Sequence, residues 1–295
     1  MTPVLALLLS VLSFSLMGVC VKSLGGRLPI SEVVLARSLI SLAVSQVLLQ
    51  RQGLSPWVPG WPLLALRGLF GTLALYALFA AYAWLPLASV TVIQFLNPAL
   101  TALLAWWCLG ERPSRRIGLA LLLGWLGVLV LLGPGTPASL PLPGVLLAAL
   151  GALLAALAYV SVRALAHQQP GLVIVYWFPL VGLILSLPLA LRHPVRPTPL
   201  ELLALLGVGL FTQVGQLGLT RGLIGLPAAR ATALTYGQVP LAALWGWLFF
   251  AETPSGSALV AALLVLASIL FSLPPSSPGV APLARSSQRG GDPGR

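Results

Sequence analysis

The sequence predicts an all-α integral membrane protein with ten transmembrane helices, arranged as two inverted five-helix repeats. Three observations predict this fold class. The 295 residues are 58% hydrophobic and only 7% charged. They divide into ten apolar stretches, most of them long enough for a helix that crosses about 30 Å of hydrocarbon. The second half also resembles the first after a shift of 141 residues.

Composition places the chain in a bilayer and argues against several other classes. A soluble domain carries roughly 25% charged residues, whereas this chain has a mean hydropathy of +1.01. The net charge is +11, but the basic residues stand one to three at a time between apolar stretches. That spacing is typical of membrane orientation and not of nucleic-acid binding. Cys20 and Cys108 lie inside apolar stretches, so neither a disulfide framework nor a metal site is predicted.

The predicted spans follow one another with short connections rich in Gly and Pro, residues that end helices. In chain order the spans are 3–23, 30–50, 61–83, 86–108, 116–132, 143–165, 171–191, 200–221, 226–250 and 256–273. The remaining 274–295 are rich in Pro, Ser, Gly and Arg, and we expect a disordered cytoplasmic tail. Glycines in "GLFG" (68–71) and "GVGL" (207–210) are expected to let helices pack closely.

The internal repeat sets the domain organisation. Residues 85–114 align without a gap on 226–255, and about a third of the aligned positions are identical, including Pro, Trp and Glu. This predicts a first repeat over 1–140 and a second over 141–273. Each repeat holds five spans, an odd number, so the second repeat would enter the membrane in the opposite orientation. Inverted repeats are a common plan among secondary transporters.

The distribution of basic residues predicts the orientation. With the N-terminus in the cytoplasm, eleven of the sixteen Lys and Arg residues would face inward and four outward, with Arg37 inside a span. The excess of inward positive charge favours cytoplasmic positions for both termini.

Charged residues inside spans are candidates for function, because a charge at the bilayer centre costs roughly 2.5–3.5 kcal/mol on insertion scales. Arg37 lies about two turns into the second span. It is interpreted either as an anion-attracting or gating residue, or as a structural arginine. Glu32 stands at the start of that span and could carry a proton, but a carboxylate is also favoured at a helix N-terminus.

Neutral polar residues beside prolines suggest a substrate cavity. Pro98 in the fourth span follows two amides, and Pro240 in the ninth follows a tyrosine and an amide. Proline kinks a span and frees a carbonyl, so a midplane site is expected at the two kinks. The alternative is that the amides bond neighbouring helices. With Arg37, the cavity candidates are Tyr76, Gln94, Asn97, Tyr159, Trp177, Gln213, Gln216, Tyr236 and Gln238.

Two glutamates mark the ends of corresponding spans. Glu111 in "LGERPS" and Glu252 in "FFAETPS" coincide under the shift of 141, and each stands before a proline and a serine. Glu111 also has Arg112, Arg115 and Arg116 nearby. We interpret both glutamates as hinge and capping residues of the two repeats, in preference to a substrate role.

The residues at the end of the first half resemble a known family. The stretch "PLASVTVIQFLNPALTALLAWWCLGERPSRRIGLALLLGWLGVLVL", with "RGLFGTLALYALFAAYAWLPLA" before it and "VVLARSLI" in the second span, is similar to the EamA-type branch of the drug/metabolite transporter superfamily. The resemblance covers about 3–273. It implies a secondary exporter or exchanger of small metabolites in a bacterial inner membrane, with a central cavity between the repeats. One departure is that Phe178 stands where the first repeat has Arg37.

The expected function is therefore secondary transport of small organic metabolites by alternating access across the inner membrane, with a lipid bilayer and a small-molecule substrate as partners. No enzymatic activity, cofactor, metal or nucleic acid is expected. Whether the chain forms a homo-oligomer is left open. The alternative is a non-transporting membrane scaffold or subunit packed through its small residues.

Overall fold

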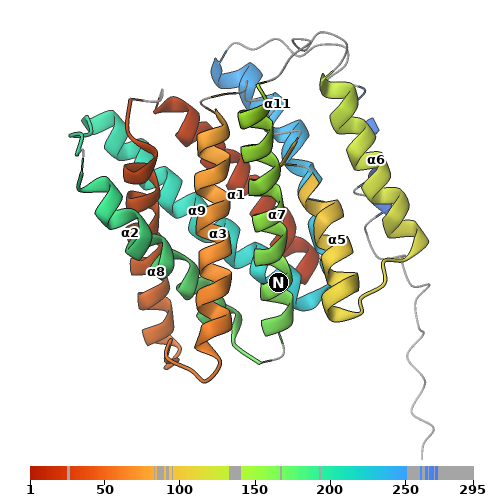
Figure 1. Cartoon of the computed structure of the whole chain (residues 1–295), viewed down its shortest axis with the longest axis horizontal. Coiled ribbons are helices and arrows are strands. Elements are labelled where there is room, and N and C mark those ends of the chain that lie inside the picture. Colours follow the sequence, from red (N-terminus) through yellow and green to blue (C-terminus); the bar gives the residue numbers. More distant parts are fainter. Residues whose placement is uncertain are drawn as a thin grey trace, which may run out of the picture.

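A computed structural model describes most of the chain as a helical bundle (Figure 1). The described residues are 1–24, 27–82, 84, 90, 93–94, 96–132, 141–166, 168–192, 194–250, 260, 263–264, 266–268 and 270–271. The helices are α1 (Pro3–Ser23), α2 (Ile30–Arg51), α3 (Trp61–Tyr82), α5 (Leu96–Leu109), α6 (Arg115–Leu132), α7 (Leu142–Leu165), α8 (Gly171–Ala190), α9 (Pro199–Gly225), α10 (Ala228–Ala233), the 3-10 helix η1 (Leu234–Gly237) and α11 (Gln238–Phe250).

Most helix ends fall close to the predicted span ends. The helix α1 has the predicted bounds, and α2 begins at the predicted Ile30. The predicted span 226–250 consists of three helical segments, because α10 ends at Ala233 and the 3-10 helix η1 stands between it and α11. Most of the predicted tenth span and the whole predicted tail lie outside the described residues.

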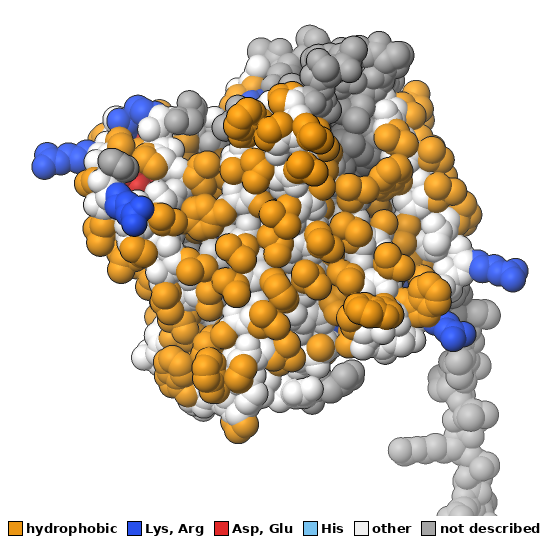
Figure 2. All heavy atoms as spheres, viewed as in Figure 1, with side chains coloured by type: hydrophobic (Ala, Val, Ile, Leu, Met, Phe, Trp, Pro, Cys, Tyr) orange, Lys and Arg blue, Asp and Glu red, His pale blue; other side chains and the backbone are white. Residues whose placement is uncertain are grey.

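The surface of the bundle is apolar, as a bilayer requires. Among the described residues, six helices are long and apolar enough to cross a membrane, namely α1, α2, α3, α7, α8 and α9, and α5 is a shorter apolar helix. Leu203 and Ile184 are 65% and 61% exposed, and contiguous apolar surface of this kind is unfavourable in water. Figure 2 shows apolar side chains across the visible face, with Lys and Arg side chains near its margins.

Helices from the two halves of the chain pack against each other. The extensive pairs are α1 with α9, α3 with α7 and α2 with α8, followed by α3 with α8 and α2 with α9. Glycines permit the close approach predicted for them. A Cβ atom on Gly68 of α3 would lie 2.8 Å from the Trp177 carbonyl oxygen of α8, and one on Gly209 of α9 would lie 2.5 Å from Ile40 Cβ of α2.

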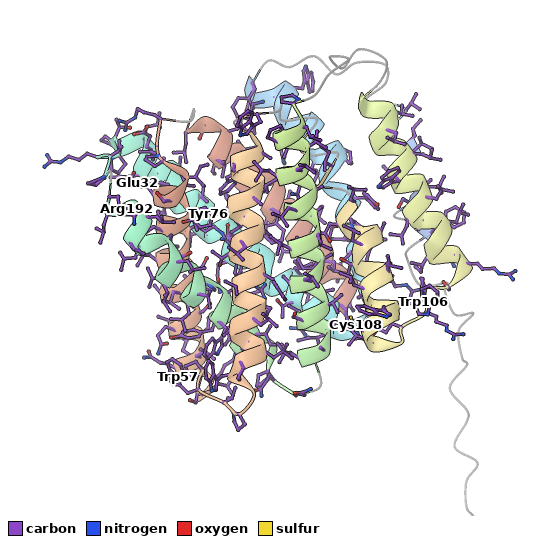
Figure 3. The ribbon with its side chains drawn as sticks, viewed as in Figure 1. Glu32, Trp57, Tyr76, Trp106, Cys108 and Arg192 are labelled. Carbon is purple, nitrogen blue, oxygen red and sulfur yellow. The ribbon has the colours of Figure 1, made fainter. Side chains whose placement is uncertain are left out.

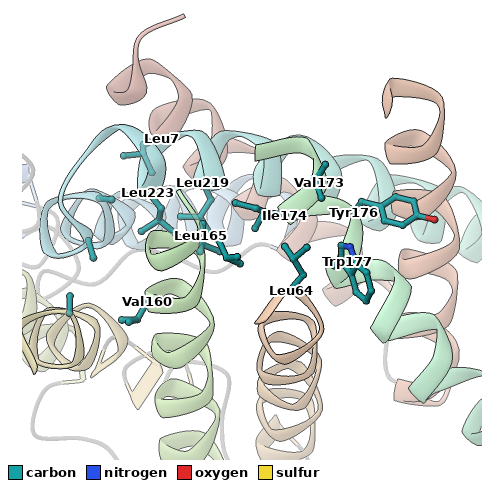
Figure 4. Packing of buried hydrophobic residues seen from close by; sticks show 14 of the residues in the cluster. Leu7, Leu64, Val160, Leu165, Val173, Ile174, Tyr176, Trp177, Leu219 and Leu223 are labelled. Carbon is teal, nitrogen blue, oxygen red and sulfur yellow. The ribbon is translucent and has the colours of Figure 1, made fainter. Parts of the chain in front are cut away.

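One end of the bundle is closed by an apolar cluster (Figure 4). Its members come from both halves of the chain: Leu7 of α1 and Leu64 of α3 pack with Leu165 of α7, Ile174 of α8 and Leu223 of α9. All five are buried. The C-terminal ends of α7 and α9 and the N-terminal ends of α3 and α8 therefore meet in a packed core.

Candidate functional site

Two buried arginines meet at one aromatic ring between the halves of the bundle. The Arg37 guanidinium of α2 and the Arg67 guanidinium of α3 lie 4.5 and 4.3 Å from the Phe178 ring centre of α8. Arg37 Nε donates to Thr212 Oγ1 of α9 at 3.2 Å, and Arg67 Nη2 donates to Gln216 Oε1 of α9 at 2.9 Å. We call these five residues the arginine cluster.

The arginine cluster lies deep in the bundle. Arg37 and Arg67 are 5% and 2% exposed. Each lies about 10 Å along its helix from the first residue. Because α2 and α3 run in opposite directions (Figure 1), the two side chains enter the interior from opposite ends and converge. The depth and the sequence separation of the members make this the central polar site of the described bundle.

No described carboxylate neutralises the two guanidinium groups. The three described acids are engaged elsewhere: Glu32 accepts from the Val195 amide, Glu111 pairs with Arg163, and Glu201 pairs with Arg27. The cation–π contacts and the two hydrogen bonds are therefore the interactions that hold the charges among the described residues. Nε and Nη1 of Arg67 are buried and have no hydrogen-bond partner among the described residues.

Further polar atoms surround the cluster. Gln213 Nε2 donates to Ser45 Oγ at 2.7 Å, while Gln213 Oε1 is buried without a described partner. Ser38 Oγ and Thr72 Oγ1 are likewise unpartnered among the described residues, and both lie beside Gly182 of α8. Gly71 of α3 makes room for the site, since a Cβ there would lie 2.8 Å from Cε2 of Phe178 and 3.1 Å from Arg67 Nη1.

Several predicted cavity residues lie at or near this site. Arg37 and Gln216 belong to the arginine cluster, and Gln213 stands next to Thr212 on the same buried stretch of α9. Tyr159 of α7 lies close to Asn97 of α5 and within electrostatic reach of Arg67. Asn97 Oδ1 also accepts from Thr101 Oγ1 at 2.9 Å.

Other predicted cavity residues contact different parts of the bundle. Trp177 donates from Nε1 to the Pro56 carbonyl and stacks on Trp61 with ring centres 6.0 Å apart, so it belongs to an aromatic group at one end of the bundle. Tyr236 is fully buried, and its ring fills the space beside Gly124 of α6.

The remaining amides and tyrosine are divided between helix contacts and the interior. Gln94 donates from Nε2 to the Ala148 carbonyl of α7 at 3.2 Å, a bond between helices. Tyr76 of α3 lies near Ser186 of α8, and its hydroxyl oxygen is buried. Gln238 is half-buried at the start of α11.

The two prolines predicted as kinks occupy similar positions. Pro98 is the third residue of α5, and Pro240 is the third residue of α11 directly after η1. Ile93 and Gln94 before α5 are also helical, and η1 directly precedes α11. Proline within a helical stretch removes a donor and clashes with the carbonyl four residues earlier. Two prolines inside α8, Pro179 and Pro188, were not singled out from the sequence, and Pro179 directly follows the ring of the arginine cluster.

Glu32 lies at one end of the bundle, away from the arginine cluster. Figure 3 places it near Arg192, whereas Trp57 lies at the other end. Its helix begins at Ile30 without a side-chain cap, and the carboxylate accepts from the Val195 amide in the connection before α9. Glu32 therefore joins the first turn of α2 to a loop of the second half.

Glu111 bonds elements from the second half of the chain, and not the neighbouring arginines. It follows Gly110, whose φ of +69° turns the chain after α5. Oε1 accepts from Arg163 Nε of α7 at 2.5 Å, and Oε2 accepts from the Ala228 amide at the start of α10 at 3.0 Å. The next helix, α6, is instead capped by Ser114, whose Oγ accepts from the Ile117 amide. Glu252 lies outside the described residues.

Arg163 completes this contact by reaching the end of α9. Its Nη1 donates to the carbonyl oxygens of Leu223 and Ile224 at 3.2 and 2.8 Å. We call Glu111, Arg163, Leu223, Ile224 and Ala228 the end clasp. It ties α5, α7, α9 and α10 together at the end of the bundle that the apolar cluster closes.

Sequence reasoning missed Arg67 and the role of Phe178. Arg67 stands near the start of its predicted span, so it was counted among the cytoplasmic orientation charges, yet it is buried at the centre of the site. Its position two turns inside the span was the signal. Phe178 was noticed only as a departure from Arg37, whereas the two side chains contact each other.

Known proteins resemble this chain along nearly its whole length. The profile of the EamA-like transporter family matches residues 1–133 and 142–273. The chain is 31% identical over 268 residues to the pseudopaline exporter CntI of Pseudomonas aeruginosa, covering 90% of this chain and 94% of that protein. It is 26% identical over 269 residues to the S-adenosylmethionine uptake transporter of Rickettsia prowazekii, covering 90% of each.

The riboflavin transporter of Rhizobium johnstonii is 28% identical over 278 residues, with 90% of this chain and 88% of that protein covered. A solved crystal structure superposes with a TM-score of 0.80 over 92% of this chain and 96% of that one. The sequence identity is 24%, so this similarity shows the fold alone. The resemblance predicted from the sequence is confirmed. The chain belongs to the EamA-like transporter family.

Proposed function

We propose that the protein is a secondary transporter that exports or exchanges a small organic metabolite by alternating access across a bacterial inner membrane. The main support for this proposal is the arginine cluster, a buried polar site built by α2 and α3 of the first half and α8 and α9 of the second. A site shared by two halves can be exposed to either side when the halves rock against each other. Both termini would lie in the cytoplasm.

The helix pairs support the two inverted five-helix repeats. A shift of 141 residues carries α1 to α7, α2 to α8 and α3 to α9. The pair α1–α9 then corresponds to the pair α3–α7, and α3–α8 corresponds to α2–α9, while α2–α8 corresponds to itself. A pseudo-two-fold axis through the α2–α8 contact would produce this set of pairs. The two separate matches of the family profile, one in each half, also favour the duplication.

Export is favoured over uptake by the pseudopaline exporter, which is 31% identical over 94% of its own length. The relatives named for S-adenosylmethionine and riboflavin support a small metabolite as cargo. The end clasp and the apolar cluster would close the cytoplasmic end in this conformation, because the C-terminal ends of α7 and α9 face inward in the proposed topology.

Flux through purified protein tests this function. Liposomes containing the full chain and loaded with a mixture of metabolites should release a subset of them, detected by mass spectrometry, while protein-free liposomes retain all. Release of the compound from the liposomes should accelerate when the same compound is added outside, because a carrier exchanges substrate faster than it returns empty. Absence of flux for every compound, together with a stable protein partner recovered from membranes, would favour the scaffold alternative.

Proton coupling through Glu32 is tested by Glu32→Gln. The amide retains an acceptor for the Val195 N–H, so the fold should persist. We expect unchanged dependence of flux on pH, because Glu32 lies at the end of the bundle and serves a loop contact. Loss of pH dependence in the variant, with its melting temperature unchanged, would instead make Glu32 the proton carrier.

A further inference from the structure

The arginine cluster holds two positive charges that the described protein leaves uncompensated. Both guanidinium groups touch the same ring, and two like charges held close together in a medium of low polarity repel each other. The acids described in the structure are bound to other groups. A buried charge without a counter-charge is costly, so this arrangement is stabilised by any anion that enters.

The donors available to an anion are specific. Arg67 has two nitrogens, Nε and Nη1, that are buried and unpartnered among the described residues. The side chain is held in place from the other side, since Nη2 donates to Gln216 and the guanidinium plane contacts Phe178. The Arg67 side chain is therefore held in one position before a ligand binds, so binding loses less conformational entropy and the affinity is higher.

We propose that Arg37 and Arg67 bind the carboxylate of an organic anion, which, on the proposed transport function, is the substrate. A carboxylate suits this site better than a phosphate for two reasons. A monoanion accepts hydrogen bonds from a guanidinium without bringing the second charge and third oxygen of a phosphate into the bilayer interior. The Phe178 ring, which both guanidinium groups contact, provides an apolar surface that suits the organic remainder of the ligand.

The first experiment measures binding without transport. The purified full chain in uncharged detergent is heated with acetate, succinate, benzoate or glycine, and separately with acetamide, succinamide, benzamide or glycinamide, at one ionic strength set with sodium chloride. Inorganic phosphate is a further probe. At least one carboxylate should raise the melting temperature while its amide does not. Equal effects of acid and amide, stabilisation by phosphate alone, or no stabilisation by any acid would overturn the proposal.

Variants assign the effect to the site. Arg67→Gln should weaken binding of the stabilising carboxylate about 10- to 100-fold, the range for loss of charge-assisted hydrogen bonds. Arg67→Lys should retain part of the affinity because it keeps the charge, and Arg37→Gln provides a second, independent test if Arg67→Gln does not fold. Arg192→Gln, in the exposed turn after α8, is the matched control and should bind as the wild type does. Undiminished binding in both Arg37→Gln and a folded Arg67 variant would contradict the assignment.

Flux separates this proposal from the proposed function. Carboxylate binding that depends on Arg67, in a protein that moves no compound, would leave the anion site intact and remove the transport function. Flux of neutral or cationic compounds that is insensitive to Arg67→Gln would leave transport intact and remove the anion site.

Discussion

Alanine at Gly218 is expected to destabilise the protein by about 3 kcal/mol, the upper part of the range for overpacking a well-packed interior. Gly218 lies on the face of α9 that packs against α1. A Cβ atom there would lie 2.3 Å from the Ala6 carbonyl oxygen and 3.0 Å from Ser10 Cβ. Backbone atoms cannot turn aside as a side chain can, so α1 and α9 would have to separate. Separation would also lengthen the 2.7 Å bond from Ser10 Oγ to the Gly215 carbonyl.

A graded series makes this prediction specific. At Gly222 a new Cβ would meet Leu7 Cγ at 2.3 Å, a side chain that can change rotamer, so Gly222→Ala should cost less. At Gly18 of α1 nothing lies within 4 Å, so Gly18→Ala should cost nothing. Thermal unfolding of the purified variants in one detergent measures the order. An equal loss at all three positions would mean that the α1–α9 contact does not set the effect, since alanine in place of a helical glycine stabilises the helix itself.

Much of the fold could be predicted because helix ends are determined locally. Apolar length, prolines and caps mark them, as at α9, where Thr198 and Glu201 form a capping box around Pro199. The break at η1 is different. The segment Leu234–Gly237 lies just before Pro240, and proline clashes with the carbonyl four residues earlier, here that of Tyr236. The sequence thus marks a disturbance, but not a 3-10 helix in which Tyr236 fills the space beside Gly124.

The site was only partly predictable because its partners come from distant helices. Depth along a span identified Arg37, and Arg67 stands almost as far inside its own span, but it was counted among the cytoplasmic orientation charges. In the proposed inverted arrangement, α2 and α8 are counterparts that pack on each other. Residues at equal repeat positions then face each other near the axis, which explains why Arg37 contacts Phe178.

The partner of Glu111 shows the same limit. Its neighbours in sequence are arginines, and local reasoning placed its charge among them. The carboxylate instead reaches Arg163, 52 residues away. Sequence analysis correctly identified the end of a span, but the partner of a charge there depends on which helix ends meet, a tertiary property.

The second large effect is expected at the end clasp, where Glu111→Ala should open the end of the bundle that the clasp closes. The substitution removes both the ion pair with Arg163 and the acceptor for the Ala228 amide. The side chains of Arg163 and Glu111 are 16% and 23% exposed, so the pair is partly desolvated. We expect a loss of about 2 kcal/mol, below the 3–5 kcal/mol for breaking a fully buried pair. Glu111→Gln should have a smaller effect, since it keeps an acceptor for Ala228.

Accessibility of a buried position at this end provides the measurement. Ala231 of α10 is fully buried in the apolar cluster, so Ala231→Cys, with Cys20 and Cys108 replaced by serine, should react slowly with a membrane-impermeant thiol reagent. Addition of Glu111→Ala should raise the rate severalfold, because the closed conformation loses stability relative to an open one. Arg163→Ala should raise it similarly, and the double variant should add little to either single change.

The exposed ion pair between Arg27 and Glu201 is the matched control. It also joins distant segments, but Arg27 is 48% exposed, and surface pairs contribute little to stability. Arg27→Ala removes this pair and leaves the Thr198–Glu201 capping box in place, so it should leave the reactivity at Ala231→Cys unchanged. Two outcomes would show whether the end clasp breaks during transport or only stabilises the fold. If Glu111→Ala accelerates both labelling and exchange flux, the clasp breaks and reforms during each transport cycle. If it lowers the melting temperature without changing either rate, the clasp stabilises the fold alone and opening at this end proceeds through other contacts.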